Sequence, residues 1–201
     1  MKLFYKSGAC SLSPHIILLE ANLPFTLEKV DLATKKTEHG DDFLKINPKG
    51  QVPTLLLDDG SILTEGVAIV QFLADKVPGR NLIPANGTLA RYHAIEWLNY
   101  IATELHKGFS PLFNPKTPDE FKEITKQKLF SQFKYLDGVL SKQQYVLGDH
   151  FSVADAYLFT ILGWAKPMHF DLTPYSSLTA YIARVTERPT VQEALKVEHG
   201  K

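Results

Sequence analysis

The first part of the chain alternates short apolar runs with stretches in which apolar residues recur at helical spacing. The runs predict strands over residues 3–5, 25–30, 52–57 and 61–63, and the spacing predicts helices over 13–23, 41–46 and 65–76. Asp58-Asp59-Gly60 is a hairpin turn signal between the last two strands. This order of elements predicts a small mixed sheet with helices packed on it.

A segment with two prolines and two glycines, residues 77–87, separates this part from a second part that is helical throughout. Helices are predicted over 89–106, 121–140, 154–164, 175–185 and 190–195, with Pro189 in the first turn of the last one. Ser152-Val-Ala-Asp155 is a capping-box pattern before the most apolar helix. We therefore expect an α/β domain over 1–80, a linker over 81–86 and an all-helical domain over 87–201.

Composition removes several classes of function. The chain has 22 basic and 22 acidic side chains, so no basic surface favours nucleic acid. It shows neither a signal peptide nor an apolar run of membrane-spanning length, so we expect a cytoplasmic protein without a membrane partner. Its seven histidines are scattered and its glycines form no phosphate-binding loop, so we expect neither a metal nor a nucleotide.

The single cysteine, Cys10, falls between the first strand and the first helix. Sites tend to form at this end of a sheet, and the partial positive charge of a helix N-terminus favours a thiolate. Ser11 and Ser13 are expected to donate hydrogen bonds to the sulfur. A Cys-x-x-Cys motif would need a cysteine in place of Ser13, so redox chemistry requires an external thiol. By position alone, a reactive thiol and a packed, inert one stay equally open.

Two backbone features point to peptide binding. Pro53 at a strand entry is compatible with a cis bond that leaves the Val52 backbone groups free to pair with an extended peptide; an ordinary strand-entry proline is the alternative. At Thr64-Glu65-Gly66, backbone N–H groups at a helix start suit a carboxylate, and a simple N-cap role of Thr64 is the alternative.

The helix over 89–106 has two faces at about 100° per residue. Its apolar face carries Ala94, Trp97, Leu98, Ile101 and Leu105, and its polar face carries Tyr92, Glu96, Asn99, Thr103 and His106. A polar face normally meets solvent. The alternative is that it faces the first domain across a cleft, where the histidine would hydrogen-bond a thiolate or a sulfur-bearing ligand.

Residues 2–13, 47–55, 63–69, 96–107 and 151–159 together resemble the cytosolic glutathione S-transferases, most closely the bacterial beta class. The segments span nearly the whole chain in the family's order. The resemblance implies a thioredoxin-like N-terminal domain, a helical C-terminal domain and a homodimer. It implies glutathione as co-substrate, with no permanently bound cofactor.

The same resemblance assigns roles to individual residues. Cys10 would lie next to the glutathione sulfur and form a mixed disulfide with it, and His106 would join it in catalysis. The other residues expected to bind glutathione are Lys35 at its glycine end, Gln51, Val52 and Pro53 at its cysteinyl part, Glu65 and Gly66 at its γ-glutamyl end, and Asn99, Thr103, Glu104 and Leu105 from the second domain. An apolar pocket between the domains would take electrophiles, and its candidate residues are Tyr5, Phe109, Leu112, Phe113, Tyr157 and Trp164.

The implied activity is conjugation of the glutathione thiol to hydrophobic electrophiles, with glutathione-dependent thiol–disulfide exchange through Cys10 as a further reaction. A non-catalytic ligand-binding or protein-interaction module on the same fold is the alternative. Such modules generally lose the residues that hold glutathione, whereas this chain keeps Cys10, Val52, Pro53, Glu65 and His106.

Overall fold

The computed structural model describes residues 1–199 of the 201-residue chain. The chain forms two compact units. One contains Met1–Ile83 together with the segment that begins at Arg188, and the other contains Pro84–Glu187. We call them the α/β unit and the helical unit. The change from one to the other at Ile83 falls inside the predicted linker, but the return of the last segment to the α/β unit was not predicted.

The α/β unit contains a five-stranded mixed sheet in the order β3-β2-β1-β4-β5. Its strands are β1 (Lys2–Tyr5), β2 (Thr26–Asp31), β3 (Lys36–Thr37), β4 (Thr54–Leu56) and β5 (Ile62–Thr64). β1 and β2 are parallel, and the other neighbouring pairs are antiparallel. The predicted hairpin between β4 and β5 is confirmed, with Gly60 in its turn at φ +84°. The two-residue β3 was missed because it is too short and too polar to show an alternating pattern.

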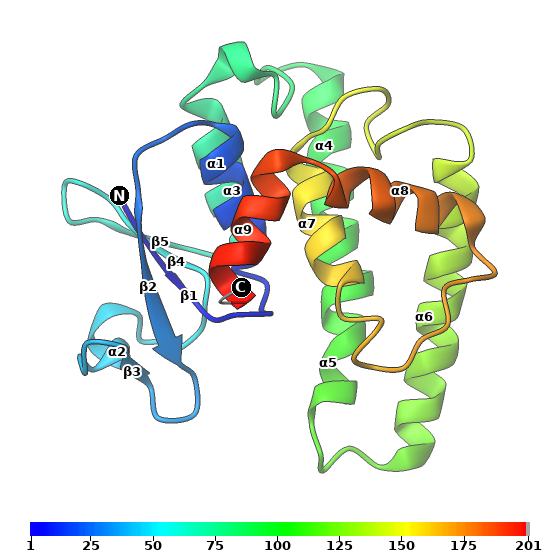
Figure 1. The fold of residues 1–201 in the computed structure, drawn as a ribbon, viewed down its shortest axis with the longest axis horizontal. Helices are drawn as coiled ribbons and strands as arrows, with labels where there is room; N and C mark the ends of the chain where they lie inside the picture. The colour runs from blue at the N-terminus through cyan, green and yellow to red at the C-terminus, as the bar shows by residue number, and fades with distance from the viewer. Residues whose placement is uncertain (200–201) are drawn as a thin grey trace. The chain divides into compact units, whose positions relative to one another are not determined.

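Helices cover both faces of this sheet, and the alternation of side chains in β1 determines what each helix contacts. α1 (Leu12–Glu20) and α3 (Gly66–Asp75) pack together on one side, and α2 (Phe43–Ile46) lies on the other (Figure 1). Phe4 points to the α2 side, where its ring centroid is 5.7 Å from that of Phe43. Tyr5 points to the α1 side, where it contacts His15. This is the thioredoxin-like arrangement expected from the sequence.

The last helix, α9 (Pro189–His199), packs on α1 rather than on the helical unit (Figure 1). Arg188 donates from Nε and Nη2 to the two carboxylate oxygens of Glu20, at 2.8 and 2.9 Å. Further along the helix, Glu198 lies 3.1 Å from Nδ1 of the buried His15. These charged contacts hold α9 to the α/β unit, so residues 189–199 do not belong to the predicted helical domain.

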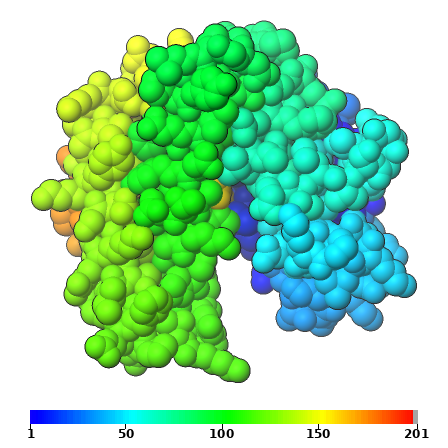
Figure 2. Space-filling view, turned by 180° about the vertical axis from the view of Figure 1, so that it is seen from behind, coloured from blue at the N-terminus to red at the C-terminus, as the bar shows by residue number. Residues whose placement is uncertain are grey.

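The helical unit is built from α4 (Leu89–Tyr100), the π-helical segment η2 (Ile101–His106), α5 (Lys107–Phe113), α6 (Asp119–Leu140), α7 (Val153–Leu162) and α8 (Ser176–Thr186). The predicted helix over 89–106 is therefore longer and contains a π-helical segment. In Figure 2, α4 and α5 run beside α6 across the visible face of this unit. Within residues 1–199, no helix is both long and apolar enough to cross a membrane.

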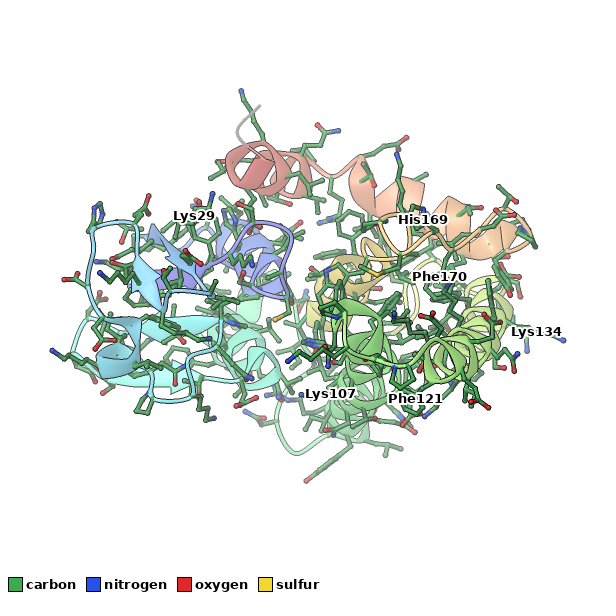
Figure 3. The ribbon with its side chains drawn as sticks, turned by 90° about the horizontal axis from the view of Figure 1, so that it is seen from below. Lys29, Lys107, Phe121, Lys134, His169 and Phe170 are labelled. Carbon is green, nitrogen blue, oxygen red and sulfur yellow. The ribbon has the colours of Figure 1, made fainter. Side chains whose placement is uncertain are left out.

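The core of the helical unit is centred on α7, in which every residue is buried. The predicted capping box at its start is confirmed, because the Asp155 carboxylate accepts from the Ser152 backbone N–H and hydroxyl at 2.9 and 2.7 Å. Phe170, in the loop after α7, lies close to α5 and α6 (Figure 3). There it packs edge-on against Phe109, Phe130 and Phe133.

Candidate functional site

Cys10 lies in the turn between β1 and α1, immediately before the first residues of the helix. Its side chain is half-buried, and its thiol donates a hydrogen bond to the carbonyl oxygen of Val52 at 3.3 Å. This contact joins two segments 42 residues apart. The predicted thiol and the predicted peptide-binding backbone are therefore neighbours in the α/β unit.

The two serines expected to support Cys10 have other roles. The Ser11 hydroxyl donates to the Lys6 carbonyl and accepts from the Lys6 N–H, so it closes the turn that carries the cysteine. Ser13 is buried in α1, and its hydroxyl makes no hydrogen bond with the described residues. Hydrogen bonds from these hydroxyls to the sulfur were expected and are not found.

The Val52–Pro53 peptide bond is cis, which decides between the two possibilities that the sequence left open at this proline. Pro53 also contacts the start of α3, since a Cβ atom added to Gly66 would lie 3.6 Å from its Cγ. The Gln51 carbonyl, one residue earlier, accepts from the buried Asn47 amide at 2.9 Å. The cis peptide bond thus lies between Cys10 on one side and the start of α3 on the other.

Lys35 extends the site beyond Val52. It has a left-handed backbone conformation, φ 57°, and its ammonium group donates to the Gly50 carbonyl at 2.8 Å. Gly50 also has a positive φ of 60°, and a Cβ there would lie 2.9 Å from Leu44 Cδ2. Glycine is therefore favoured at position 50, and the Lys35 ammonium is held at the residue before Gln51.

Glu65 precedes α3 with a φ of 69°, which is uncommon for a residue with a side chain. Such conformations cluster at ligand sites, where the surrounding structure maintains them. Its carboxylate binds the Lys49 ammonium at 2.5 Å, and the same ammonium donates to the Thr64 hydroxyl at 3.0 Å. Thr64 ends β5 and is not the N-cap of α3, which removes the alternative role considered for it.

Lys49 was not predicted as a site residue, although it lies inside one of the resembling segments. Its contact with Glu65 spans 16 positions and follows no helical or strand period, so only the fold reveals it. Nothing in the sequence indicates that the Lys49 ammonium lies beside the Glu65 carboxylate.

The candidates in the helical unit differ in exposure. Asn99 and Thr103 are exposed, with the Thr103 hydroxyl donating to the Asn99 carbonyl at 3.1 Å. Glu104 is half-buried and lies 3.1 Å from the Lys128 ammonium of α6. The Leu105 side chain is fully buried in the core, so only its backbone is available to a ligand.

His106 does not share the exposure of Asn99 and Thr103. It ends η2 half-buried, with Nδ1 2.6 Å from the Tyr157 hydroxyl of α7. The Trp164 ring packs against the imidazole at a centroid distance of 5.0 Å. Burial, and next the nearby Lys107 ammonium, lower the pKa of His106 to about 4. The imidazole is therefore neutral at pH 7.

The residues expected to bind electrophiles occupy different depths. Phe113, at the end of α5, is 47% exposed and meets the Trp164 ring edge-on at 5.1 Å, and Leu112 beside it is half-buried. Phe109 is fully buried and packs edge-on against the Trp164 ring, so it supports that ring and is not itself accessible to an electrophile. Tyr157 is also buried, behind His106. Tyr5 belongs to the α/β unit; burial, then Glu38 and Glu198, raise the pKa of its phenol.

The chemistry available to this set is that of sulfur, backbone amides and charged side chains. Within residues 1–199, no group of three or more His, Cys, Asp or Glu side chains is placed to hold a metal ion. In the α/β unit, the Cys10 thiol, the backbone at the cis Val52–Pro53 bond and the Lys35–Gly50 and Lys49–Glu65 contacts lie along neighbouring segments. Such a set suits a small peptide with charged ends.

Comparison with known proteins gives two family matches. The family model described as the N-terminal domain of glutathione S-transferase matches residues 8–76, and that of the C-terminal domain matches residues 100–189. The chain is 53% identical over 198 residues to glutathione S-transferase GstA of Escherichia coli O157:H7, covering 98% of both chains. It is 36% identical to glutathione S-transferase GST-4.5 of Xanthomonas campestris pv. campestris, again covering 98% of both.

Solved structures agree. The chain superposes with a TM-score of 0.97 on a ternary complex of BphK, a bacterial glutathione S-transferase, at 55% identity, covering 99% of this chain and 100% of that one. A sphingomonad glutathione S-transferase complexed with glutathione gives a TM-score of 0.96 at 45% identity, covering 99% of both chains. A beta-class enzyme of Sphingomonas chungbukensis gives 0.96 at 47% identity, covering 98% of both.

Proposed function

Because the chain belongs to the glutathione S-transferase family, in its bacterial beta class, we propose that its α/β unit binds glutathione through the groups that surround Cys10. The chain is a glutathione transferase: it joins the thiol of glutathione, its co-substrate, to an electrophile. The relatives support this activity over a non-catalytic module on the same fold.

One observation carries the proposed binding mode: the Cys10 thiol lies 3.3 Å from the Val52 carbonyl, beside the cis Val52–Pro53 bond. In our proposal the cysteinyl part of glutathione pairs with the Val52 backbone and brings its sulfur next to Cys10. Gln51 and Pro53 shape the same stretch of backbone. Lys35, whose ammonium group contacts the Gly50 carbonyl next to Gln51, binds the glycine carboxylate of glutathione.

At the other end, we propose that Glu65 and the Gly66 N–H hold the γ-glutamyl group. The carboxylate suits the glutamyl ammonium, and the N–H at the start of α3 suits its carboxylate. The ammonium group of Lys49, which contacts Glu65, adds a positive charge near the glutamyl carboxylate of glutathione. Assignment of Asn99, Thr103, Glu104, Leu105 and His106 to the same ligand rests on the resemblance of their segment.

We propose that conjugation uses His106, a role that rests on the resemblance of its segment. A hydrogen-bond donor on His106 stabilises the glutathione thiolate, which attacks the electrophilic carbon; the leaving group departs, and the thiol proton goes to solvent. We propose that Phe113 offers ring surface to hydrophobic electrophiles, with the half-buried Leu112 beside it and the buried Trp164 ring packed against it. Phe109, Tyr157 and Tyr5 support the rings around them.

Thiol–disulfide exchange is the second proposed reaction. The Cys10 thiolate attacks a disulfide that contains glutathione, forms a Cys10–glutathione disulfide and releases the other thiol. A second glutathione thiolate then attacks this mixed disulfide, releasing oxidised glutathione and restoring Cys10. No second protein cysteine is needed.

Calorimetry and enzyme assays test the binding mode. We expect Lys35→Ala to weaken glutathione binding about 10- to 160-fold, the range for a hydrogen bond to a charged group, with little change in kcat at saturation. Its exposed neighbour Lys36 is the matched control, and Lys36→Ala should leave affinity unchanged. Equal affinities in wild type and Lys35→Ala would remove Lys35 from the site. If the wild type neither conjugates an aryl halide to glutathione nor reduces a glutathione mixed disulfide, the proposed activity is wrong.

Cys10→Ala separates the two reactions. We expect disulfide exchange to disappear, because it passes through a covalent bond to this sulfur, while conjugation partly survives. Loss of both activities with glutathione binding intact would mean that Cys10 activates the glutathione thiol directly.

We further propose a homodimer formed through α4 and α6. These helices expose Leu89, Tyr92, Phe121, Ile124 and Tyr135. The two helices lie side by side (Figure 2) and are joined by the Tyr100–Gln132 hydrogen bond. Sedimentation should give twice the 22.6 kDa mass of the chain. Tyr92→Glu should shift it to monomer, whereas the exposed Val197→Glu on α9 should not.

A cytoplasmic location is also proposed, because reducing surroundings keep the half-buried single thiol of Cys10 in its reduced form. Cell fractionation checks this. Recovery of the protein outside the cytoplasmic fraction would contradict it.

A further inference from the structure

The imidazole of His106 is held between two aromatic side chains that come from α7 and the turn after it. The Tyr157 hydroxyl lies 2.6 Å from Nδ1, and the Trp164 ring stands at 73° to the imidazole with a centroid distance of 5.0 Å. Tyr157 is only 5% exposed, so little water competes for its hydroxyl. Since all of these contacts lie in one compact unit, the ring has one well-defined orientation.

We propose that Tyr157 is a positioning residue: its hydroxyl donates to Nδ1 of His106 and thereby keeps the proton of the neutral imidazole on Nε2. The inference deepens the proposed function and rests on it for its catalytic consequence, because it specifies which group His106 presents to the glutathione sulfur. Tyr157 would then act through the histidine and not as a wall of the electrophile pocket.

The length of the hydrogen bond indicates its donor. N–H···O bonds in proteins range over about 2.7–3.2 Å, whereas a hydroxyl donor forms shorter bonds, about 2.5–3.0 Å to an oxygen acceptor. The 2.6 Å separation lies in the hydroxyl range and below the range for an imidazole N–H donor. A neutral imidazole has one donor nitrogen and one acceptor nitrogen, so an accepting Nδ1 requires a protonated Nε2.

The charges around the ring agree with a neutral imidazole. Lys107 follows it directly and disfavours a second proton. The nearest carboxylate along η2 is Glu104, which is paired with Lys128 of α6. From α7, the facing titratable group is Tyr157 itself.

The tautomer decides the chemistry of His106. With the proton on Nε2, the ring offers an N–H donor that stabilises a thiolate. With the proton on Nδ1, the ring would offer a lone pair that repels a thiolate and acts only as a base. Tyr157 would therefore set His106 as a hydrogen-bond donor to sulfur.

Spectroscopy tests the proposal without relying on activity. Long-range proton–nitrogen spectra of the full chain labelled with ¹⁵N-histidine report which ring nitrogen carries the proton, and His106→Gln assigns the signal. We expect protonated Nε2 in the wild type and a mixture of tautomers in Tyr157→Phe. A wild-type proton on Nδ1, or identical His106 signals in the two proteins, would overturn the inference.

Kinetics tests the consequence for catalysis. Tyr157→Phe should lower kcat for conjugation about tenfold, the size of one neutral hydrogen bond, with KM for glutathione changed less than about twofold. Tyr181→Phe is the matched control, because its buried hydroxyl bonds to Asp155 in the same unit and does not contact His106. It should lower stability without changing kcat or the His106 spectrum.

Equal losses of kcat in the two variants would reduce Tyr157 to a structural role and overturn the proposal. A wild type that lacks conjugation activity would refute the proposed function instead, and the tautomer measurement would still decide the role of Tyr157.

Discussion

Removal of the Asp155 carboxylate should destabilise the helical unit more than any surface change, because this one group joins three segments. It is fully buried and accepts from the Val146 N–H at 3.0 Å, from the Ser152 N–H at 2.9 Å and from the Ser152 hydroxyl at 2.7 Å. The Tyr181 hydroxyl of α8 also donates to it, at 3.2 Å. Asp155→Ala therefore leaves four donors without their acceptor.

The cost is dominated by the two backbone N–H groups, which cannot turn to find another partner. Each buried and unpaired donor costs about 1–3 kcal/mol, which gives about 2–6 kcal/mol for the pair. The hydroxyls can rotate, and Tyr181 keeps the Asp155 carbonyl at 3.3 Å. Removal of the buried carboxylate also removes its desolvation penalty, which offsets part of this cost. We therefore expect the free energy of unfolding to fall by about 2–4 kcal/mol at pH 7.5.

The same carboxylate predicts how this loss depends on pH. Burial raises the pKa of Asp155 to about 6, despite its hydrogen bonds. The folded state then binds a proton more tightly than the unfolded state, so the contribution of Asp155 to stability is largest below about pH 4 and falls as the pH rises through 6. The difference between wild type and Asp155→Ala should be about 1 kcal/mol larger at pH 5 than at pH 7.5.

Urea unfolding followed by tryptophan fluorescence measures this loss, because Trp97 and Trp164 both lie in the helical unit. A series of protein concentrations separates dissociation from unfolding. The control is Asp171→Ala, which removes an exposed carboxylate that accepts from the Thr173 N–H and hydroxyl in the same unit. It should leave the unfolding midpoint unchanged. The reasoning fails if the two variants unfold at the same urea concentration.

Further predictions concern a buried histidine, the aromatic core and the last helix. Burial lowers the pKa of His106 to about 4, so its contribution to stability is complete above about pH 6.5 and is lost as the pH falls towards 4. Urea unfolding at pH 7.5 and at pH 5 measures this loss in the wild type, and His106→Asn should lack it. Phe170→Ala should cost about 3–5 kcal/mol in urea unfolding, because it empties a site packed on Phe109 and two other rings; a smaller loss for Phe170→Leu would be consistent with that reason. Glu20→Gln should weaken the paired hydrogen bonds to Arg188 and speed amide hydrogen exchange in α9, and unchanged exchange there would show that apolar packing alone holds this helix.

Features determined by neighbours in sequence were predictable. The hairpin at Gly60 follows from its turn residues, and the capping box at Ser152 follows from the spacing of Asp155. At Pro53 the sequence left a cis bond and an ordinary strand-entry proline open, and the structure contains the cis bond. The hairpin and the capping box depend on a few consecutive residues, so a local pattern is enough to reveal them, whereas the strand-entry proline alone did not decide between cis and trans.

Features determined by distant pairs were not predictable. The assignment of α9 to the α/β unit depends on Arg188 and Glu20, which are 168 positions apart. The contact of Lys49 with Glu65 depends on how two loops meet. A single sequence records the charges of such residues but not their partners, and the composition, with equal numbers of both signs, gave many possible pairings.

His106 shows how a regular pattern can indicate the right residue for an incomplete reason. A uniform helical period places it in one stripe with Asn99 and Thr103, which are exposed. The structure has a π-helical segment over Ile101–His106, in which each residue turns by a smaller angle about the axis than in an α-helix. This under-rotation separates His106 from the exposed stripe and brings Nδ1 to the Tyr157 hydroxyl, 51 positions away. The chemistry of the histidine therefore depends on a departure from the period that identified it, and no pattern in the helix itself could have supplied its partner.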